Sequence, residues 1–205
     1  MSAPACYAPQ TAFLAHFRKR VEDFPHQAYL KPDPARVEAF RARLNEGGNE
    51  PVVGICWRSM LLAMKRSKFY SRLTDWEPIL KTKGVRFLNL QYGDCEQELA
   101  QAETLFGIKI ERMAGHDLTD DIDGNAALSA ALDLVISAPT AVAATAAAVG
   151  TETWFLLSYN DWPQLGTDEY PWYPKTRTFV SKRFADWPDA TARIADALKK
   201  FADSH

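Results

Sequence analysis

The sequence predicts an α/β fold in which helices cover both faces of a doubly wound, mainly parallel β-sheet. The first observation behind this prediction is a set of short, continuous apolar runs, such as VVGICW (52–57) and LVISA (134–138). Such runs are typical of strands that are buried on both faces. The second observation is that helix-forming segments separate the runs, which favours parallel strands joined by right-handed crossovers. We therefore expect at least five strands, with 134–138 in the centre and the following helix packed against it.

Residues 1–34 differ from the rest of the chain because they contain several prolines and no long periodic run. We interpret them as an N-terminal arm or linker, with one short helix around 12–21, that docks on the domain or on a neighbouring chain. Residues 35–205 then form a single domain. A helix at 33–44 leads into it, with Asp33 as a suitable N-cap and Pro34 as a suitable first helical residue.

The remaining elements follow from residue 52 onward. Thr74 or Asp75 is placed to cap the helix near 73–83, and Gly107 is placed to end the helix at 94–106. The expected strands are 52–57, 85–92, 108–113, 134–138, 151–159 and 176–181, and the expected helices are 73–83, 94–106, 121–133, 140–149 and 186–202.

Composition excludes several classes of protein. A hydrophobic content of 47% over 205 residues is ample for a packed core. A formal net charge of −2 argues against a nucleic-acid partner. No apolar run is long enough for a membrane span, and the N-terminus lacks the pattern of a signal peptide. The three cysteines, Cys6, Cys56 and Cys95, show no metal-site spacing, so we expect reduced thiols and a cytoplasmic protein.

Ligands of doubly wound sheets bind beyond the carboxyl ends of the strands, where the strand order switches. This rule turns the loops that follow the predicted strands into a candidate site. In strand order, these loops hold Trp57, Arg58, Ser59, Lys65, Arg66 and Lys68; then Gln91, Tyr92, Gly93 and Asp94; then Met113, His116 and Asp117; then Pro139, Thr140 and Ala141; and finally Asn160, Asp161 and Trp162.

Two of these loops together predict a diphosphate site. Cations of the first loop face the start of the helix at 140–149, whose free N–H groups and positive dipole end favour anions. Small residues in TAVAATAAAVG let that helix lie close to the sheet, and Thr140 can offer a hydroxyl. The alternative, that this alanine-rich helix serves packing alone, stays open. No GxGxxG, GxxxxGK[ST] or GxSxG motif is present, which disfavours a nicotinamide dehydrogenase, a P-loop NTPase and an α/β-hydrolase.

The third loop carries His116 and an acidic cluster made of Asp117, Asp120, Asp121 and Asp123. A single histidine in a loop is usually just solvated. The carboxylates are suited to cap the following helix. Coordination of a cation and hydrogen bonding to a ribose are the alternatives.

A longer pattern runs through these motifs: VVGICWRS, KRSKFY, WEPIL, GVRFLNLQYGD, ALSAALDLVISAPTAVAATAAAVGTETWFLL and YPWYPKTRTF, in this order. Over roughly residues 29–200 the chain resembles the C-terminal, Rossmann-like half of GT-B glycosyltransferases. It is most similar to the glycosyltransferase domains of bacterial TPR-repeat proteins, and more distantly to heptosyltransferases and O-linked N-acetylglucosamine transferases. The resemblance implies a domain that binds a nucleotide sugar, with a separate half that supplies the acceptor site and often the catalytic base.

By position, the resemblance implies a set of nucleotide-sugar contacts. It places the first loop motif on Trp57, Arg58 and Ser59, phosphate contacts on Lys65 and Arg66, the second loop on Gln91 and Tyr92, and the diphosphate turn on Thr140, Ala141 and Val142. His116 and Asp117 are added as neighbouring candidates, including for a general base. No acidic metal-binding motif ends a strand, so we expect no metal and no cofactor besides the donor, with positive charge and the helix dipole neutralising the diphosphate.

Two departures from the family pattern bear on activity. Relatives carry Asp-Thr-Ala-x-x-His at the turn, whereas this chain has Pro139 and Ala144 at the acid and imidazole positions. Proline cannot accept a hydrogen bond from a sugar hydroxyl, and alanine cannot polarise a phosphate. The region before the first strand is also too short for a whole acceptor half. Two hypotheses follow: a metal-independent glycosyltransferase that works with a TPR or acceptor-domain partner, or a non-catalytic nucleotide-sugar-binding or protein-interaction domain.

Overall fold

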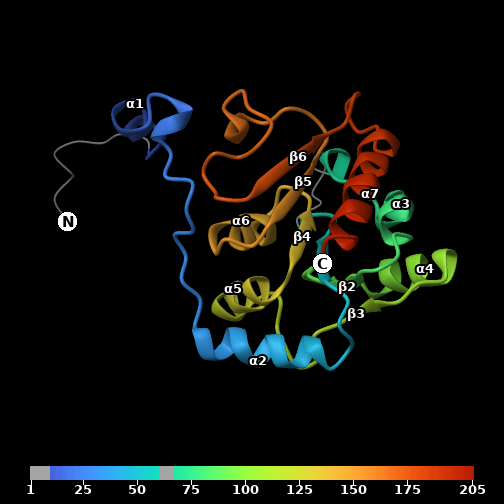
Figure 1. Cartoon of the computed structure of the whole chain (residues 1–205). Coiled ribbons are helices and arrows are strands. Elements are labelled where there is room, and N and C mark those ends of the chain that lie inside the picture. The colour runs from blue at the N-terminus through green and yellow to red at the C-terminus, as the bar shows by residue number, and fades with distance from the viewer. Residues whose placement is uncertain (1–9, 61–66) are drawn as a thin grey trace, which may run out of the picture.

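Six parallel strands form one sheet in the order β3-β2-β1-β4-β5-β6 in the computed structural model, which describes residues 10–60 and 67–205 (Figure 1). The strands are β1 (Val52–Cys56), β2 (Arg86–Asn89), β3 (Ile110–Glu111), β4 (Leu134–Ser137), β5 (Thr153–Leu157) and β6 (Thr176–Val180). Every pairing in the sheet is parallel, and β4 lies between β1 and β5. The doubly wound Rossmann-like fold and the central place of the fourth strand are therefore confirmed.

Helices cover the two faces of the sheet as separate layers, seen on opposite sides of the strands in Figure 1. One layer consists of α2 (Pro34–Asn45), α5 (Ile122–Ala131) and α6 (Ala141–Ala148), and the other of α3 (Glu77–Leu80), α4 (Glu96–Phe106) and α7 (Pro188–Ala202). Each layer closes over its own group of buried apolar side chains. Short helical turns complete the chain: η1 (Gln10–Phe13), α1 (Leu14–Phe17), η2 (Val21–Asp23), η3 (Ser67–Phe69), η4 (Leu73–Trp76) and η5 (Trp162–Gln164).

All six predicted strands are longer than those observed, and those expected at 85–92, 108–113 and 151–159 are too long by four residues each, the last being only Thr153–Leu157. The strand expected at 85–92 ends at Asn89, because the Asn89 side-chain oxygen accepts a hydrogen bond from the N–H of Gln91 at 3.0 Å and turns the chain. The strand expected at 108–113 is only Ile110–Glu111. It lies at the edge of the sheet, where it pairs with β2 over two residues, so little of the apolar run has a neighbour to pair with.

The helix predicted near 73–83 is wrong in its form, and its cap is right in part. The chain makes the 3₁₀ turn η4 and then the four-residue helix α3. Asp75 does take part in a cap: it lies inside η4 as the third residue of a capping box, where its carboxylate accepts a hydrogen bond from the N–H of the N-cap Arg72 at 2.8 Å, whereas Thr74 caps neither element. In the arm, the single helix expected around 12–21 is replaced by η1, α1 and η2, since these short turns lack an apolar face packed on the core.

Helix α6 lies close to the sheet because its inward face is made of alanine. Ala143, Ala146 and Ala147 are fully buried, and α6 contacts both β4 and β5. This confirms the predicted packing of the helix on the central strand. Gly150, at φ 94°, ends the helix in a conformation that a residue with a side chain rarely adopts.

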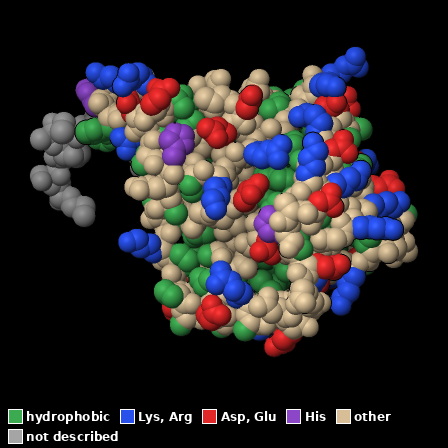
Figure 2. All heavy atoms as spheres, viewed as in Figure 1, with side chains coloured by type: hydrophobic (Ala, Val, Ile, Leu, Met, Phe, Trp, Pro, Cys, Tyr) green, Lys and Arg blue, Asp and Glu red, His purple; other side chains and the backbone are tan. Residues whose placement is uncertain are grey.

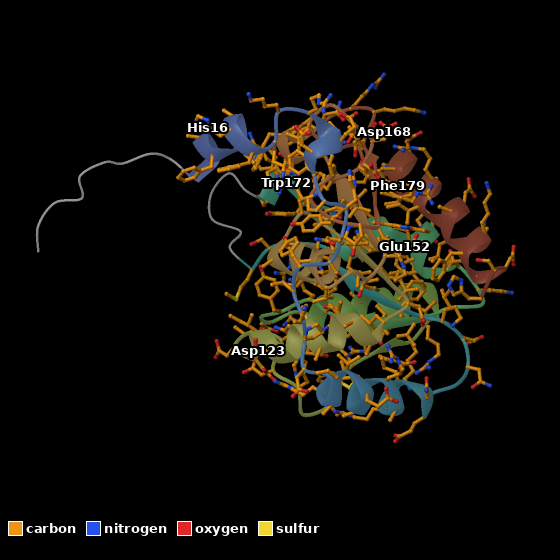
Figure 3. The ribbon with its side chains drawn as sticks, turned by 60° about the vertical axis from the view of Figure 1, so that its left-hand side comes forward. His16, Asp123, Glu152, Asp168, Trp172 and Phe179 are labelled. Atoms are coloured by element: carbon orange, nitrogen blue, oxygen red, sulfur yellow. The ribbon has the colours of Figure 1, made fainter. Side chains whose placement is uncertain are left out.

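The end of the arm lies on the domain at the carboxyl end of α6. The N–H groups of Tyr29 and Leu30 donate to the carbonyl of Ala148 at 3.0 and 3.1 Å. The Phe24 ring meets Trp172 edge to face at 4.8 Å, and Figure 3 shows Trp172 beneath the N-terminal segment. These contacts join residues 24–30 to the domain, while the division of the chain at residue 34 stays a prediction.

Acidic and basic side chains are interspersed over the face shown in Figure 2. Around α7, for example, Asp189 pairs with Lys182 at 2.5 Å and with Arg193 at 2.9 Å. Within the described part of the chain, no helix has both the length and the apolar character that a membrane crossing requires.

Candidate functional site

The strand order switches between β1 and β4, which lie side by side in the middle of the sheet. The chain leaves β4 into α6 on one face, and the connection that leaves β1 ends in α3 on the other face. A crevice between two such connections is where ligands of doubly wound sheets bind. The loops that begin at Trp57 and at Ala138 border this position.

The loop after β1 is held by Glu98 of α4. The Nε atom of Arg58 donates to the Glu98 carboxylate at 2.9 and 3.1 Å, and its Nη2 atom bonds both Glu98 and the carbonyl of Asp94, the latter at 3.0 Å. The Arg58 side chain is only 11% exposed, and the bonds with Glu98 raise the pKa of Arg58. The charge of Arg58 is therefore already balanced inside the protein.

Glu98 also fixes Trp57. The indole Nε1 donates to the Glu98 carboxylate at 2.5 Å, and the ring is fully buried. Partial burial acts to raise the pKa of Glu98, but the hydrogen bonds from Arg58 and Trp57 outweigh it and the pKa is lowered. Trp57 and Arg58 thus lie together as predicted, with their polar atoms turned to Glu98, while Ser59 beside them is half-buried.

A buried polar group joins the ends of three strands. The Gln91 side-chain oxygen accepts from the N–H of Arg58 at 3.0 Å and from the thiol of Cys56 at 3.5 Å. The Cys56 sulfur also lies 3.7 Å from the hydroxyl of Thr140, which is 3.4 Å from the Ser137 hydroxyl. Burial raises the pKa of Cys56 to about 11, so it stays a neutral thiol. Gln91 therefore supports the loops of the site from below.

The start of α6 is open. Thr140 occupies the N-cap position, but its side chain makes no capping hydrogen bond and instead faces Cys56 and Ser137. Among the described residues, none accepts a hydrogen bond from the N–H groups of Ala141 or Val142. Ala141 is exposed and Val142 is half-buried. The positive end of an eight-residue helix therefore lies at the switch point, and no side chain of the described residues caps it.

A cavity of about 240 Å³ lies on one side of this helix start, between α5 and α6. Its walls combine apolar and hydroxyl- or amide-bearing side chains: Leu90, Tyr92, Leu118, Thr119, Ile122, Asn125, Ser129, Ala141, Val142 and Thr145. Tyr92, Leu118 and Thr119 also line a second hollow of about 570 Å³ that extends toward β3. The two hollows thus share part of their walls at the carboxyl edge of the sheet.

His116 and Asp117 border the second hollow but are engaged in the protein. The His116 side chain is 3% exposed, its Nε2 atom lies 2.8 Å from the Asn125 side-chain oxygen, and its ring meets Phe40 edge to face. The Asp117 carboxylate accepts from the N–H groups of Thr119 and Asp120, and these backbone bonds lower its pKa. Both therefore shape the loop.

One member of the acidic cluster caps a helix, as predicted. The Asp121 carboxylate accepts from the N–H of Gly124 at 2.9 Å at the start of α5. It also forms an ion pair with Arg36 of α2, which ties the two helices together. In the part of the chain that the structure describes, no group of three His, Cys, Asp or Glu side chains is arranged to hold a metal ion.

A further cavity, of about 230 Å³, lies on the other side of the α6 start. It is lined by Phe69, Tyr70, Pro139, Leu157, Ser158, Tyr159 and Asp161. Sequence reasoning placed Asp161 at a strand end but gave it no role. The signal available was the polar pair Asn160-Asp161 directly after the predicted strand 151–159. Lys65 and Arg66, predicted as phosphate contacts, lie outside the described residues.

No protein-family model matches the chain. Among curated proteins, it is 45% identical over 193 residues to Protein FlbA of Caulobacter vibrioides. That match covers 94% of this chain but 32% of FlbA, so the chain spans about a third of the length of this relative.

Three solved structures with a similar fold are bacterial glycosyltransferases. The ADP-heptose LPS heptosyltransferase II of E. coli matches with a TM-score of 0.58 at 14% identity, over 91% of this chain and 59% of the enzyme. The glycosyl transferase family 9 protein of Veillonella parvula matches with a TM-score of 0.53 at 10% identity, over 89% and 55%. The E. coli heptosyltransferase WaaC with ADP gives 0.50 at 16%, over 82% and 48%. The chain therefore has a glycosyltransferase-like, Rossmann-like fold.

Proposed function

We propose that this chain binds a nucleotide-activated sugar through its diphosphate and serves as the donor-binding half of a glycosyltransferase. The observation that carries the proposal is the open start of α6 at the switch point, flanked by a cavity on each side. Backbone N–H groups and the helix dipole at such a position favour a phosphate group. The fold shared with an ADP-heptose heptosyltransferase supports the same ligand class.

The start of α6 accounts for one phosphate group, and the negative charge of the second phosphate group needs side-chain cations. Since Glu98 already neutralises Arg58, we assign this role to Lys65 and Arg66 of the same loop. Together with the helix dipole they would neutralise the leaving diphosphate without a metal ion. Thr140 and Gln91 then act by holding the two loops in place, and Trp57 does so through Glu98.

We place the nucleobase in the cavity between α5 and α6. Tyr92, Leu118 and Val142 give it apolar walls, while the side chains of Thr119 and Asn125 supply polar atoms at its rim. A mainly apolar pocket with a few polar groups is the usual form of a site for a planar ligand. The hollow shared by Tyr92 and Asp117 leaves room for the ribose.

Transfer of the sugar requires a partner half. The chain spans 59% and 55% of the length of the first two glycosyltransferases that it matches, and about a third of FlbA. Neither of the two candidates for a general base is free, because the His116 side chain is buried and Asp117 is bonded to the backbone. A TPR-repeat or acceptor-domain protein is the partner we propose, in the cytoplasm, where Cys56 and Cys95 stay reduced.

A non-catalytic binding domain is the second candidate. It is favoured by Pro139 and Ala144, which stand where the resemblance expects an acid and an imidazole, and by the neutralised charge of Arg58. Such a domain would still hold a nucleotide sugar but would not activate it. Both candidates require the α6 site, and they differ in turnover once a partner is supplied.

Calorimetric titration with UDP, GDP and ADP tests the α6 site. Wild type should bind at least one of them, and Ala141→Asp should abolish binding because it places a carboxylate at the helix start. Ala39→Asp, at an exposed position in the middle of α2, is the matched control and should bind as wild type does. Absence of binding by wild type at about 1 mM would contradict the proposal.

A further inference from the structure

The end of the N-terminal arm is held on the domain by two pairs of aromatic rings. Phe24 meets Trp172 edge to face, with ring centroids 4.8 Å apart, and Tyr29 stacks on Tyr173 at 6.0 Å. Phe24 is 5% exposed, and among residues 12–34 it is the only one that is buried. We call residues 24–30, which carry both contacts, the strap.

Both rings that receive the strap belong to the 161–173 loop, which lies between β5 and β6. Trp172 is half-buried, and its indole Nε1 donates to the carbonyl of Pro163 at 2.9 Å. Its ring also meets Trp162 edge to face, with 5.8 Å between the centroids. Trp172 thus joins the two ends of the loop, and Phe24 packs against it from the arm.

The same loop reaches the candidate site. Asp161 is its first residue and lines the cavity of about 230 Å³ beside the start of α6. The N–H of Asp161 donates to the side-chain oxygen of Gln164 at 2.7 Å, and the Gln164 amide donates to the hydroxyl of Thr178 on β6 at 3.0 Å. A continuous path of contacts therefore leads from Phe24 through Trp172 and η5 to the cavity wall.

We propose that the strap holds this loop in place, so that the position of the arm controls the order of the cavity wall at Asp161. Release of the strap separates the buried Phe24 ring from Trp172 and exposes apolar surface on both. The preceding part of the arm adds little hold, because Phe13 and Phe17 are 54% and 67% exposed. Strap and loop therefore form one small cooperative unit that opens while the sheet stays folded.

Coupling of this kind is reciprocal, so the loop orders the strap as much as the strap orders the loop. Backbone N–H groups on both sides can report it. In the loop, the N–H groups of Asp161 and Thr167 donate to Gln164 at 2.7 and 2.9 Å. In the strap, the N–H groups of Tyr29 and Leu30 donate to the carbonyl of Ala148.

Hydrogen exchange of the full-length chain, followed by NMR at these four N–H groups, tests the strap. Phe24→Ala should speed exchange at the two loop groups about tenfold, as expected for loss of an edge-to-face ring pair. Trp172→Ala should speed exchange at the two strap groups by a similar factor. The N–H groups of β4 should exchange as in wild type in both variants, because the opening is local.

Two control variants match these substitutions. Phe17→Ala removes a ring of the same arm that is 67% exposed, and Leu105→Ala truncates a side chain of α4 that is 59% exposed. Both should exchange as wild type does at all four groups. Phe24→Ala carries the test where Trp172→Ala does not fold, because Phe24 lies in the arm and outside the sheet and its helices.

Two results would overturn the strap. Unchanged exchange in the loop of Phe24→Ala would show that the loop is ordered without the arm. Faster exchange in β4 by the same factor would show that Phe24 serves the stability of the whole domain. The experiment contains no ligand, so its failure leaves the α6 site standing, and absence of nucleoside diphosphate binding leaves the strap standing.

Discussion

The loops after β1 and β4 begin at neighbouring strand ends, yet they present opposite chemistry to the crevice. The loop after β1 carries Arg58, whose positive charge is neutralised by the carboxylate of Glu98 in α4. The loop after β4 carries no charged side chain from Pro139 to Ala144, and the N–H groups of Ala141 and Val142 bond no acceptor among the described residues. A charged side chain in a candidate site is thus weaker evidence for a ligand than an unsatisfied donor is.

This difference also separates support from contact. The side chains of Trp57 and Arg58 donate hydrogen bonds to Glu98. The Gln91 side chain bonds the backbone N–H of Arg58 and the backbone carbonyl of Tyr92. We call Trp57, Arg58, Gln91 and Glu98 the floor of the site. The start of α6 is held on this floor through the contact between Cys56 and Thr140. Changes in the floor should therefore appear first as lost stability, and changes beside α6 should appear first as altered ligand affinity.

The largest expected effect is in the floor. Glu98→Gln removes the carboxylate that bonds both Arg58 and Trp57 and leaves the arginine side chain, 11% exposed, without its counter-ion. Breaking such a pair costs about 3–5 kcal/mol when fully buried, and since Glu98 is 35% exposed we expect about 2–3 kcal/mol. Urea unfolding measures it. Glu96→Gln, a more exposed carboxylate on the same helix, should cost under about 0.5 kcal/mol; equal losses would remove the distinction between floor and surface.

The next effect is on binding. Because Arg58 is paired with Glu98, other cations of the loop must contact the diphosphate. Arg66→Ala should therefore weaken nucleoside diphosphate binding by about 1.5–3 kcal/mol, roughly ten- to a hundredfold. Competition with inorganic pyrophosphate in calorimetry measures this loss. Arg72→Ala is the matched control, because that exposed arginine pairs with Asp75. Unfolding midpoints should stay equal for both variants, and a loss of affinity common to both would indicate general charge attraction.

A pH titration sharpens the same comparison with a smaller effect. The folded-state pKa of Glu98 is lowered, so its contribution to stability is present above its unfolded pKa of about 4.3 and is lost as the pH falls through the folded value. The stability difference between wild type and Glu98→Gln should therefore be constant near pH 7 and shrink below about pH 4.3. A difference that does not change down to about pH 3 would show that packing, and not ionisation, carries the loss.

The smallest expected effect concerns the open loop. Pro139→Asp combined with Ala144→His introduces the acid and imidazole that the resemblance expects at this turn. We expect discrimination between a nucleotide sugar and the bare diphosphate to rise severalfold, by about 1 kcal/mol, through one added hydrogen bond. Calorimetry of the double variant with both ligands measures the gain. A variant that binds neither, beside a wild type that binds neither, would show that the fold has been kept for another purpose.

Local patterns accounted for much of the fold. The apolar runs identified the strands, because a strand buried on both faces has no polar face to show. The N-cap at Asp33 was also predictable, and its carboxylate accepts from the N–H of Ala35 at 2.9 Å. Strand ends were less predictable, since β3 stops where β2 stops pairing with it, and pairing partners are distant in sequence.

The position of the site was predictable from the sequence, whereas the hydrogen-bond and ion-pair partners of its residues were less predictable. The switch-point rule placed Arg58, Gln91 and Thr140 together, and they do meet through Cys56. The pairing of Arg58 with Glu98 joins residues that are 40 positions apart, and no local pattern in the sequence signals it. The cavity around Asp161 assembles loops that follow three different strands, so it exists only once the sheet order is known.

The alanine face of α6 has a consequence for how this protein can change over generations. Ala143, Ala146 and Ala147 are fully buried, so any larger side chain there would push the helix away from the sheet. The helix start would shift with it, and the donors at Ala141 and Val142 would be displaced. We therefore expect few accepted substitutions on the inner face of α6, although that face does not contact the proposed ligand. Exposed positions of the same helix should accept more substitutions. Selection for ligand binding should therefore conserve the buried alanines of α6, which do not contact the ligand.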